Sequence, residues 1–272
     1  MKKKKTLFSR LTDCYLLLLL LFIYLPILYV VVFSFNESKS LTNFTGFSLR
    51  WYRSMMEDKT MQSAIYYTVL VAVIATVVST IVGTIAAIGL SKSRKLLKSI
   101  VLEINNLPVM NPDIVTAIGL MLLFISMKIE LSLLTLVLSH ISFCIPYVIL
   151  SIMPKLRQLD DNVAEAALDL GATPWQALTK VIIPQILPAI ISGALIAFSM
   201  SFDDFVISFF TAGVGINNIS MYVYSMKRYN PGINALSTLI VVVVTVILIL
   251  VNVLPVLREK RRKQALATSQ RS

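Results

Sequence analysis

Six long apolar runs constrain the fold of this chain more than any other feature of its sequence. Each run is long enough to cross the ~30 Å hydrocarbon core of a bilayer, which needs about 20 helical residues. Hydrophobic residues make up 57% of the chain and charged residues 14%, which is more apolar surface than one soluble core hides. The runs lie near residues 13–35, 63–90, 101–127, 131–153, 186–210 and 235–256.

None of these runs alternates strictly between apolar and polar residues, as the strands of a membrane barrel do. A helix satisfies its backbone hydrogen bonds within one segment and is therefore stable in lipid. The predicted fold class is an all-α integral membrane protein with six transmembrane helices. We expect a basic N-terminus at 1–12, a transmembrane domain at 13–256 and a basic tail at 257–272.

The formal net charge of +11 comes from short clusters of Lys and Arg that flank the apolar runs. The sequence has no basic face interleaved with aromatic residues, so nucleic acid is not indicated as a partner. If the N-terminus is cytoplasmic, most of the 25 Lys and Arg residues fall on the cytoplasmic side, as the positive-inside rule requires. Both termini are therefore predicted to be cytoplasmic, with membrane lipid around the spans.

The sequence contains no recognisable catalytic or metal-binding constellation. Cys14 and Cys144 fall inside predicted spans and have neither disulfide nor CxxC spacing. The only histidine, His140, lies in the middle of a span, where an interior polar contact is the simplest interpretation. The glycines form neither the G-x-x-x-x-G-K-[ST] nor the G-x-G-x-x-G pattern. The chain is therefore predicted to be non-catalytic and to hold no cofactor.

The polar segment at about 154–185, between the fourth and fifth runs, predicts two short helices joined by a turn. Asn162 is a candidate cap for the first helix, and Gly171 suits the left-handed position that ends it. The second helix has Thr173 as its cap, Pro174 at its first position and Gln176 closing a capping box.

The first of these helices has an apolar face and an acidic face. An amphipathic helix that lies on a bilayer usually carries Lys and Arg on its polar face, whereas this one carries carboxylates. Docking to another protein is therefore favoured over lying on the membrane. The apolar face consists of Val163, Ala166, Ala167 and Leu170, and the acidic face of Glu165 and Asp169.

The same segment resembles the EAA loop of ATP-binding-cassette (ABC) importer permeases, whose pattern is EAA-x3-G-x9-I-x-L-P. Glu165, Ala166, Ala167 and Gly171 match it, and nine residues later VIIP, which ends at Pro184, takes the place of I-x-L-P. The resemblance implies coupling helices at about 160–180 that dock into a cytoplasmic ATPase. ATP and magnesium would then be bound by that partner ATPase, present as a pair, and not by this chain.

Three carboxylates inside the predicted spans are candidates for a substrate pathway, because each costs roughly 2.5–3.5 kcal/mol to insert. Asp113 directly follows NNLPVMNP, where two prolines four residues apart break the helix. Asp204 shares a stripe of span five with Ser201, Ser208 and Thr211, and the stripe is predicted to face a wet cavity. Asp203 lies about 100° further around the helix.

The charge of the cargo follows from these acids. Neighbouring carboxylates repel each other unless a cation lies nearby, and spans three and five contain no Lys or Arg to neutralise them. A cationic substrate is the simplest explanation. The alternative is that Asp113 or Asp203 pairs with a basic residue of a partner subunit or caps a broken helix.

Several runs also resemble the spermidine/putrescine importer permeases, particularly the second of their two paired subunits. That resemblance implies that Trp51, Asp113, Asp203 and Asp204 contact a polyamine. Permeases for ferric iron, thiamine or sulfate share the EAA loop and stay open as alternatives. The runs are FSFN from Phe33 with Trp51 and Tyr52, SFDDFVISFFTAG from Ser201, YVYSM from Tyr222 and NALSTL from Asn234.

The sequence therefore predicts a polyamine permease subunit in a bacterial inner membrane. The resemblance implies a homologous permease as its heterodimer partner and a binding protein outside the cell that delivers the substrate. A proton-driven secondary transporter is the rival from another class, but such folds usually contain inverted repeats, and no matching halves are evident here. A membrane-anchored interaction protein without transport would leave the intramembrane acids without a purpose.

Overall fold

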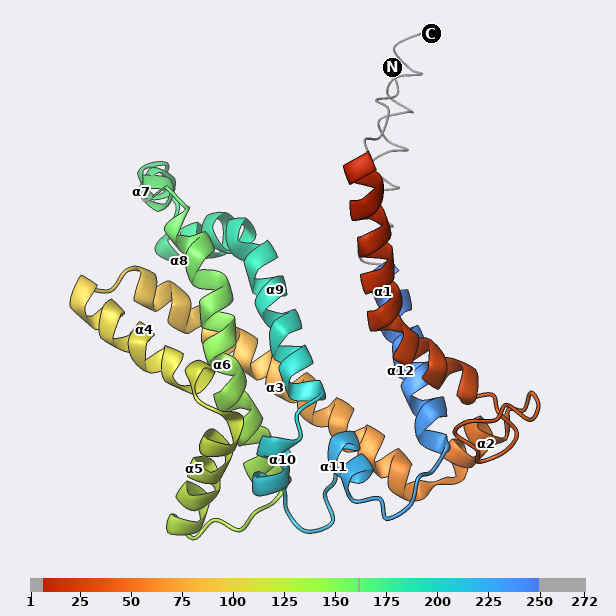
Figure 1. Ribbon diagram of the computed structural model, residues 1–272. Helices are drawn as coiled ribbons and strands as arrows, with labels where there is room; N and C mark the ends of the chain where they lie inside the picture. The colour runs from red at the N-terminus through yellow and green to blue at the C-terminus, as the bar shows by residue number, and fades with distance from the viewer. Residues whose placement is uncertain (1–6, 161, 250–272) are drawn as a thin grey trace. The chain divides into compact units, whose positions relative to one another are not determined.

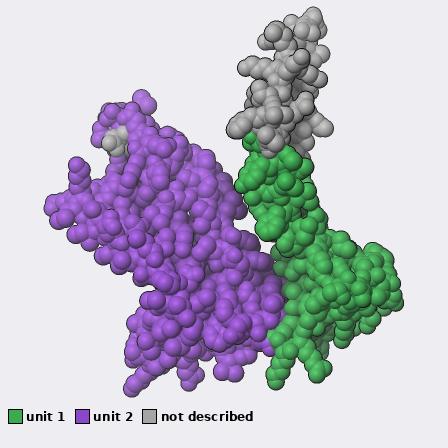
Figure 2. Space-filling view, in the orientation of Figure 1, with its two compact units in different colours: residues 1–59, 226–272 green, residues 60–225 purple. Residues whose placement is uncertain are grey.

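The computed structural model describes residues 7–160 and 162–249, and these residues are almost entirely helical (Figure 1). Within them, the β-structure is limited to one isolated bridge between Asn36 and Phe47. The chain divides into two compact units, residues 1–59 with 226–272 and residues 60–225 (Figure 2).

The described residues of the first unit form α1, α2 and α12, and α12 packs against both of the others. The long helix α1 is apolar from Cys14 to Phe33 and exposed along most of that stretch, as expected for a helix surrounded by lipid or by partner helices. The helices are α1 (Leu7–Phe33), α2 (Arg50–Glu57) and α12 (Gly232–Leu248).

The loop between α1 and α2 is held together by Asn36, which is buried. Its side-chain oxygen accepts hydrogen bonds from the N–H and the hydroxyl of Thr45. Its amide nitrogen donates to the carbonyls of Ser40 and Asn43. One polar side chain therefore satisfies several backbone groups that a loop of this length would otherwise leave unpaired.

The second unit is built around α6 and α9, which lie side by side (Figure 1). Its core contains Val148, Ile152, Ile186 and Ala197, all fully buried. The helices are α3 (Lys59–Ser91), α4 (Lys95–Met110), α5 (Asp113–Ser126), α6 (Leu133–Arg157), α7 (Asn162–Asp169), α8 (Pro174–Gln176), the π-helix η1 (Ala177–Ile182), α9 (Ile183–Phe202), α10 (Val206–Thr211) and α11 (Ile219–Tyr224).

The predicted third span is bent sharply at its proline-rich segment. The axes of α4 and α5 meet at 106°, and the break lies at Asn111 and Pro112, whose backbones are extended. Pro108 stays inside α4, so Pro112 alone marks the break. A proline ring excludes the preceding residue from helical geometry, which explains why the helix stops at Met110.

The prediction of six spans is only partly supported. Four helices of the described residues are long and apolar enough to cross a membrane, and the bent pair α4 and α5 makes a fifth if it is one span. The predicted sixth span, 235–256, corresponds to α12, whose apolar part Gly232–Val246 is shorter than a full crossing. Its last residues, 250–256, lie outside the described residues, as does the tail at 257–272.

The predicted fifth span is also broken, which the sequence did not indicate. α9 ends at Phe202, three residues follow, and α10 begins at Val206. The interpretation of 186–210 as one continuous helix was therefore wrong. No proline or glycine marks this break, and the side chains that stabilise it come both from the break itself and from other parts of the chain.

Two glycines of α3 differ in what surrounds them. A Cβ atom on Gly83 would lie 2.7 Å from Cγ1 of Val148 on α6, whereas a Cβ on Gly89 would meet nothing within 4 Å. Small residues let membrane helices approach closely. Gly83 therefore fixes the distance between α3 and α6.

We expect Gly83→Ala to lower the free energy of unfolding by about 1–3 kcal/mol, because overpacking a closed contact costs that much. Gly89→Ala should leave stability unchanged or raise it slightly, because alanine favours helix. The measurement is the temperature at which detergent-solubilised chain loses its monodisperse peak. Combining Gly83→Ala with Val148→Ala should recover much of the stability lost in Gly83→Ala. Equal shifts of the transition temperature in Gly83→Ala and Gly89→Ala would disprove the close contact.

Candidate functional site

The first helix of the loop between α6 and α9 ends in a left-handed turn. Gly171, just beyond α7, has a φ of 85°. Its N–H donates to the carbonyl of Leu168, and the N–H of Ala172 donates to that of Ala167. These are the two hydrogen bonds of a Schellman cap, which needs a residue that tolerates positive φ. The left-handed conformation predicted at Gly171 is confirmed.

The start of α7 differs from the prediction. Asn162 is not the cap but the first residue of the helix, and its N–H donates to Oδ1 of Asp160 at 3.0 Å. The sequence offers more than one capping side chain here, so composition alone does not decide which one is used.

The second helix of the loop begins as predicted. Oγ1 of Thr173 accepts a hydrogen bond from the N–H of Gln176, and the side-chain oxygen of Gln176 accepts one from the N–H of Thr173. Pro174 occupies the first helical position. The three-residue helix α8 continues through η1 into α9, so the loop is joined without a break to a helix of the core.

The side chains of this loop are largely exposed. Glu165, Ala166 and Pro184 are exposed and Ala167 is half-buried. Leu170 is 89% exposed and Trp175 is 70% exposed. Large exposed apolar side chains are typical of protein interaction surfaces; the docking role of this loop stays a prediction.

The break between α9 and α10 is organised by the carboxylate of Asp204. Its Oδ1 accepts from the N–H of Ile207 at 3.2 Å, and its Oδ2 accepts from the N–H and the hydroxyl of Ser208, both at 2.8 Å. The side chain is only 6% exposed. Asp204 therefore caps α10, satisfying two N–H groups that the start of a helix leaves free.

His140 on α6 completes this arrangement. Its Nδ1 lies 2.7 Å from Oγ of Ser201, and its Nε2 lies 3.0 Å from Oγ of Ser208 and 3.4 Å from Oδ2 of Asp204. Because the hydroxyl of Ser208 donates to Asp204, we assign a proton to Nε2 of His140. The imidazole thus connects the end of α9 to the start of α10.

The carbonyl groups freed by the break have partners as well. The amide nitrogen of Asn218 donates to the carbonyl of Asp204 at 2.7 Å, and the hydroxyl of Ser220 donates to that of Asp203 at 3.2 Å. The hydroxyl of Thr135 donates to the carbonyl of Thr211 at 2.8 Å, at the end of α10. Several backbone groups at the break are therefore satisfied inside the protein, as a non-helical segment in lipid requires.

The predicted pathway residues of the second unit fall into two groups. Ser201 and Ser208 are buried and belong to the hydrogen-bond network around Asp204. Asp203 and Asp113 are exposed, and Asp113 begins α5 directly after the bend. Within the described residues, the stripe of span five faces His140 and not an open cavity. Both exposed carboxylates follow a broken helix.

Trp51 lies in the first unit and has a structural contact there. Its ring is 4% exposed, and its Nε1–H donates to the carbonyl of Asn36 at 2.7 Å. The hydroxyl oxygen of Tyr52 lies 2.8 Å from the hydroxyl oxygen of Ser34. Residues of the FSFN run therefore form hydrogen bonds with Trp51 and Tyr52, which belong to the same sequence pattern. A contact between Trp51 and substrate stays a prediction.

Two residues of the network were missed by the sequence analysis. His140 was interpreted as an interior polar contact, which is confirmed, but its link to Asp204 was not foreseen. Asn218 was not singled out, although an asparagine before a short apolar helix is a capping signal, and it does cap α11. The polar residue in the middle of span four was the available signal for a buried network.

The chain belongs to the family described as binding-protein-dependent transport system inner membrane component, whose pattern matches residues 79–264. It is 39% identical over 234 residues to the putrescine transport system permease protein PotI of Escherichia coli K12, covering 83% of each chain. It is 34% identical over 224 residues to the spermidine/putrescine transport system permease protein PotC of that organism, covering 82% of this chain and 85% of that one. It is thus a multi-pass membrane protein of an import system.

A more distant relative with a solved structure shares the fold. It comes from a bacterial ABC transporter involved in the import of the acidic polysaccharide alginate, and its sequence is 17% identical. The superposition covers 95% of this chain and 98% of that chain with a TM-score of 0.72. The two chains therefore have the same fold.

We expect Asp204→Asn to destabilise the chain by roughly 1–3 kcal/mol for each buried donor that loses its acceptor. An amide nitrogen in place of Oδ2 cannot accept from Ser208 or His140. Asp203→Asn, at the adjacent exposed position, should change stability by less than about 0.5 kcal/mol. Thermal melting of the purified chain in detergent is the measurement, and similar melting temperatures for the two variants would contradict the capping role of Asp204.

Proposed function

We propose that this chain is the membrane-spanning permease subunit of an ABC importer for polyamines. The observation that carries the proposal is its identity of 39% to PotI and 34% to PotC, over 83% and 82% of its length. Those proteins are named for putrescine and for spermidine with putrescine, which are small polycations. The exposed carboxylates Asp113 and Asp203 support a cationic cargo.

The proposed complex contains further subunits. A homologous permease forms the second half of the pathway, a pair of cytoplasmic ATPases binds ATP and magnesium, and an extracytoplasmic binding protein delivers the polyamine. In this arrangement Glu165, Ala166, Ala167, Gly171 and Pro184 form the segment that docks to the ATPase. The exposed side chains of Leu170 and Trp175 support this docking surface.

The coupling proposal has a direct structural basis. The loop runs from α8 through η1 into α9 without interruption, and α9 packs along α6. A displacement of the loop by the ATPase would therefore move α9 as a rigid element, since Ile186 and Ala197 anchor it in the core. α9 ends at the break that holds Asp203, so nucleotide-driven closure reaches the proposed substrate path.

The proposed orientation places both termini and the loop at 154–185 on the cytoplasmic side of a bacterial inner membrane. It rests on the clustering of Lys and Arg at one set of helix ends, which the positive-inside rule assigns to the cytoplasm. The loop between α1 and α2 then faces the binding protein. Its close packing around Asn36 offers a preformed surface for that contact.

We expect Gly171→Val to abolish ATP-dependent uptake while leaving the chain in the membrane, because a β-branched residue is strained at the positive φ of the Schellman turn. Gly171→Asn is the matched control, because asparagine tolerates that conformation, and it should retain uptake. The measurements are uptake of radiolabelled polyamine and the amount of chain in the membrane fraction. Normal uptake by the valine variant would remove the loop from the coupling mechanism.

We expect Asp113→Asn and Asp203→Asn each to reduce spermidine or putrescine uptake on the order of ten-fold, the effect of losing about 1.4 kcal/mol of attraction. Both residues are exposed, so the complex should still assemble. Asp204→Asn should reduce uptake together with stability, because its carboxylate has structural partners. The measurement is uptake in a strain without other polyamine importers.

Asp13→Asn provides the control for this comparison, because Asp13 lies on α1 in the first unit, whereas Asp113 and Asp203 belong to the second. It should cost little uptake. Unchanged uptake in both Asp113→Asn and Asp203→Asn would disprove the cation pathway. Uptake of ferric iron or thiamine in place of polyamines would disprove the substrate but not the permease role.

A further inference from the structure

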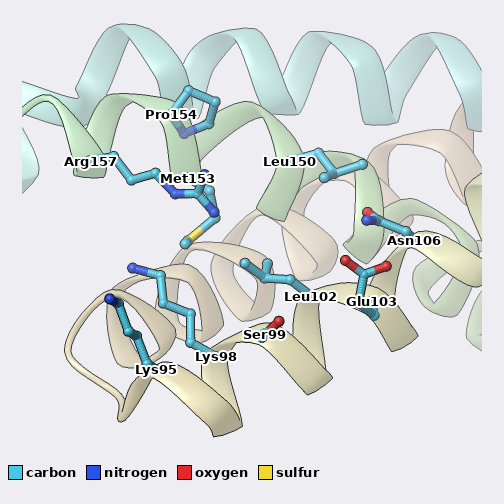
Figure 3. Close-up of a pocket in the computed structure, with 10 residues that line it drawn as sticks. All are labelled: Lys95, Lys98, Ser99, Leu102, Glu103, Asn106, Leu150, Met153, Pro154 and Arg157. Atoms are coloured by element: carbon cyan, nitrogen blue, oxygen red, sulfur yellow. The ribbon is translucent and has the colours of Figure 1, made fainter.

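Two adjoining pockets lie where the ends of α3 and α6 meet the start of α4. The first has a volume of ≈ 360 Å³ and is lined by α4 and the end of α6 (Figure 3). The second has a volume of ≈ 320 Å³ and extends toward the end of α3. Lys98 and Arg157 line both pockets. The two pockets therefore share one wall of basic side chains.

Four cations and two acids are the charged residues that line this double pocket. Lys95 lines the first pocket and Lys92 the second, in addition to the two shared residues. In Figure 3, Lys95, Lys98 and Arg157 gather at one end of the first pocket, and Glu103 lies at the other end. Within the described part of the chain, none of these four cations has a carboxylate within ion-pair distance.

The convergence of these cations favours an anion. Like charges that line one pocket repel each other. The acid of the second pocket, Asp160, already accepts a hydrogen bond from the N–H of Asn162. A phosphate group would accept hydrogen bonds from Lys98 and Arg157 together and offset their repulsion.

An apolar surface borders the basic pocket. The side of α4 that does not face α6 is strongly exposed, and it begins in the same turn as Lys95 and Lys98. A ligand with a phosphate at one end and hydrocarbon chains at the other matches this pairing of charge and apolar surface. The exposed side chains are Leu96 at 74%, Leu97 at 54%, Ile100 at 48%, Ile104 at 59% and Leu107 at 55%.

We propose that Lys92, Lys95, Lys98 and Arg157 bind the phosphate headgroup of an anionic phospholipid, whose acyl chains lie along the exposed face of α4. Basic pockets between membrane helices bind such headgroups in general. The second pocket is also lined by Asp160 and Val163 at the start of the EAA-type loop and by Ile182 at its end. A bound headgroup therefore contacts both ends of the loop, so the site links lipid composition to the position of the loop.

The test uses the full chain in nanodiscs that contain phosphatidylglycerol and phosphatidylcholine in equal amounts, with native mass spectrometry of the lipids retained on release. The unmodified chain should retain phosphatidylglycerol in preference to phosphatidylcholine. In the double variant Lys98→Gln/Arg157→Gln, the ratio of retained phosphatidylglycerol to phosphatidylcholine should fall on the order of ten-fold. The reason is that two basic residues that attract an anionic headgroup are lost.

The matched control is Lys155→Gln with Lys180→Gln, which removes the same charge from the same region without touching either pocket. It should retain the lipid preference. The variant Lys98→Arg with Arg157→Lys preserves both charges and should retain it too, which separates charge from a folding defect. Equal retention by the pocket variant and its control would overturn the proposal, and an acidic protein segment would then be the better occupant.

A second arm distinguishes a lipid from a free anion. Inorganic phosphate is added to the chain in nanodiscs of phosphatidylcholine alone, and thermal stability is compared with that in phosphatidylglycerol. We expect phosphatidylglycerol to raise the melting temperature and millimolar phosphate to have no comparable effect. A phosphate effect as large as the lipid effect would overturn the lipid assignment, because the acyl chains would then contribute nothing.

Discussion

The need to satisfy backbone hydrogen bonds at a break in an apolar span is the constraint on which this structure depends. Between α9 and α10 the chain leaves the helix for three residues, and lipid offers no water to replace the lost bonds. The carboxylate of Asp204 accepts hydrogen bonds from the N–H groups of Ile207 and Ser208 at the start of α10. Asn218 and Ser220 donate to the carbonyls of Asp204 and Asp203. His140 anchors the carboxylate to α6, so the end of α9 cannot move independently of that helix.

A helix end could be predicted from the sequence where the residues that cause it lie close to it in the chain. The loop helices were predictable because Gly171 and the Thr173–Gln176 pair act within a few residues, and the bend before α5 was marked by Pro112. The end of α9 at Phe202 was not predicted, because the local cap at Asp204 depends on contacts with Asn218, beyond α10, and with His140, on α6. The prediction that the polar stripe of span five faces an open cavity was made by projecting its residues onto one continuous helix, which the break does not allow.

The same limit applies to Trp51. Aromatic residues near the ends of spans are typical of membrane interfaces and of cation-binding surfaces alike, and nothing in the local pattern separates these roles from a buried one. The indole is buried, and its N–H donates to the carbonyl of Asn36; the FSFN run and Trp51 share the family pattern, but that pattern does not say that they contact each other. A role for Trp51 in passing a polyamine therefore requires its ring to become exposed during the transport cycle.

The neighbouring acids Asp203 and Asp204 have different physical roles although the sequence gives them equal weight. The charge of Asp204 is balanced by two N–H donors, a hydroxyl and an imidazole, so it needs no cation from a substrate. The side chain of Asp203 is exposed; its backbone N–H donates to the carbonyl of Ser199, and its own carbonyl accepts from Ser220. The electrostatic argument for a cationic cargo therefore rests on Asp203 and Asp113. Asp204 contributes by holding the break in the shape that leaves Asp203 accessible.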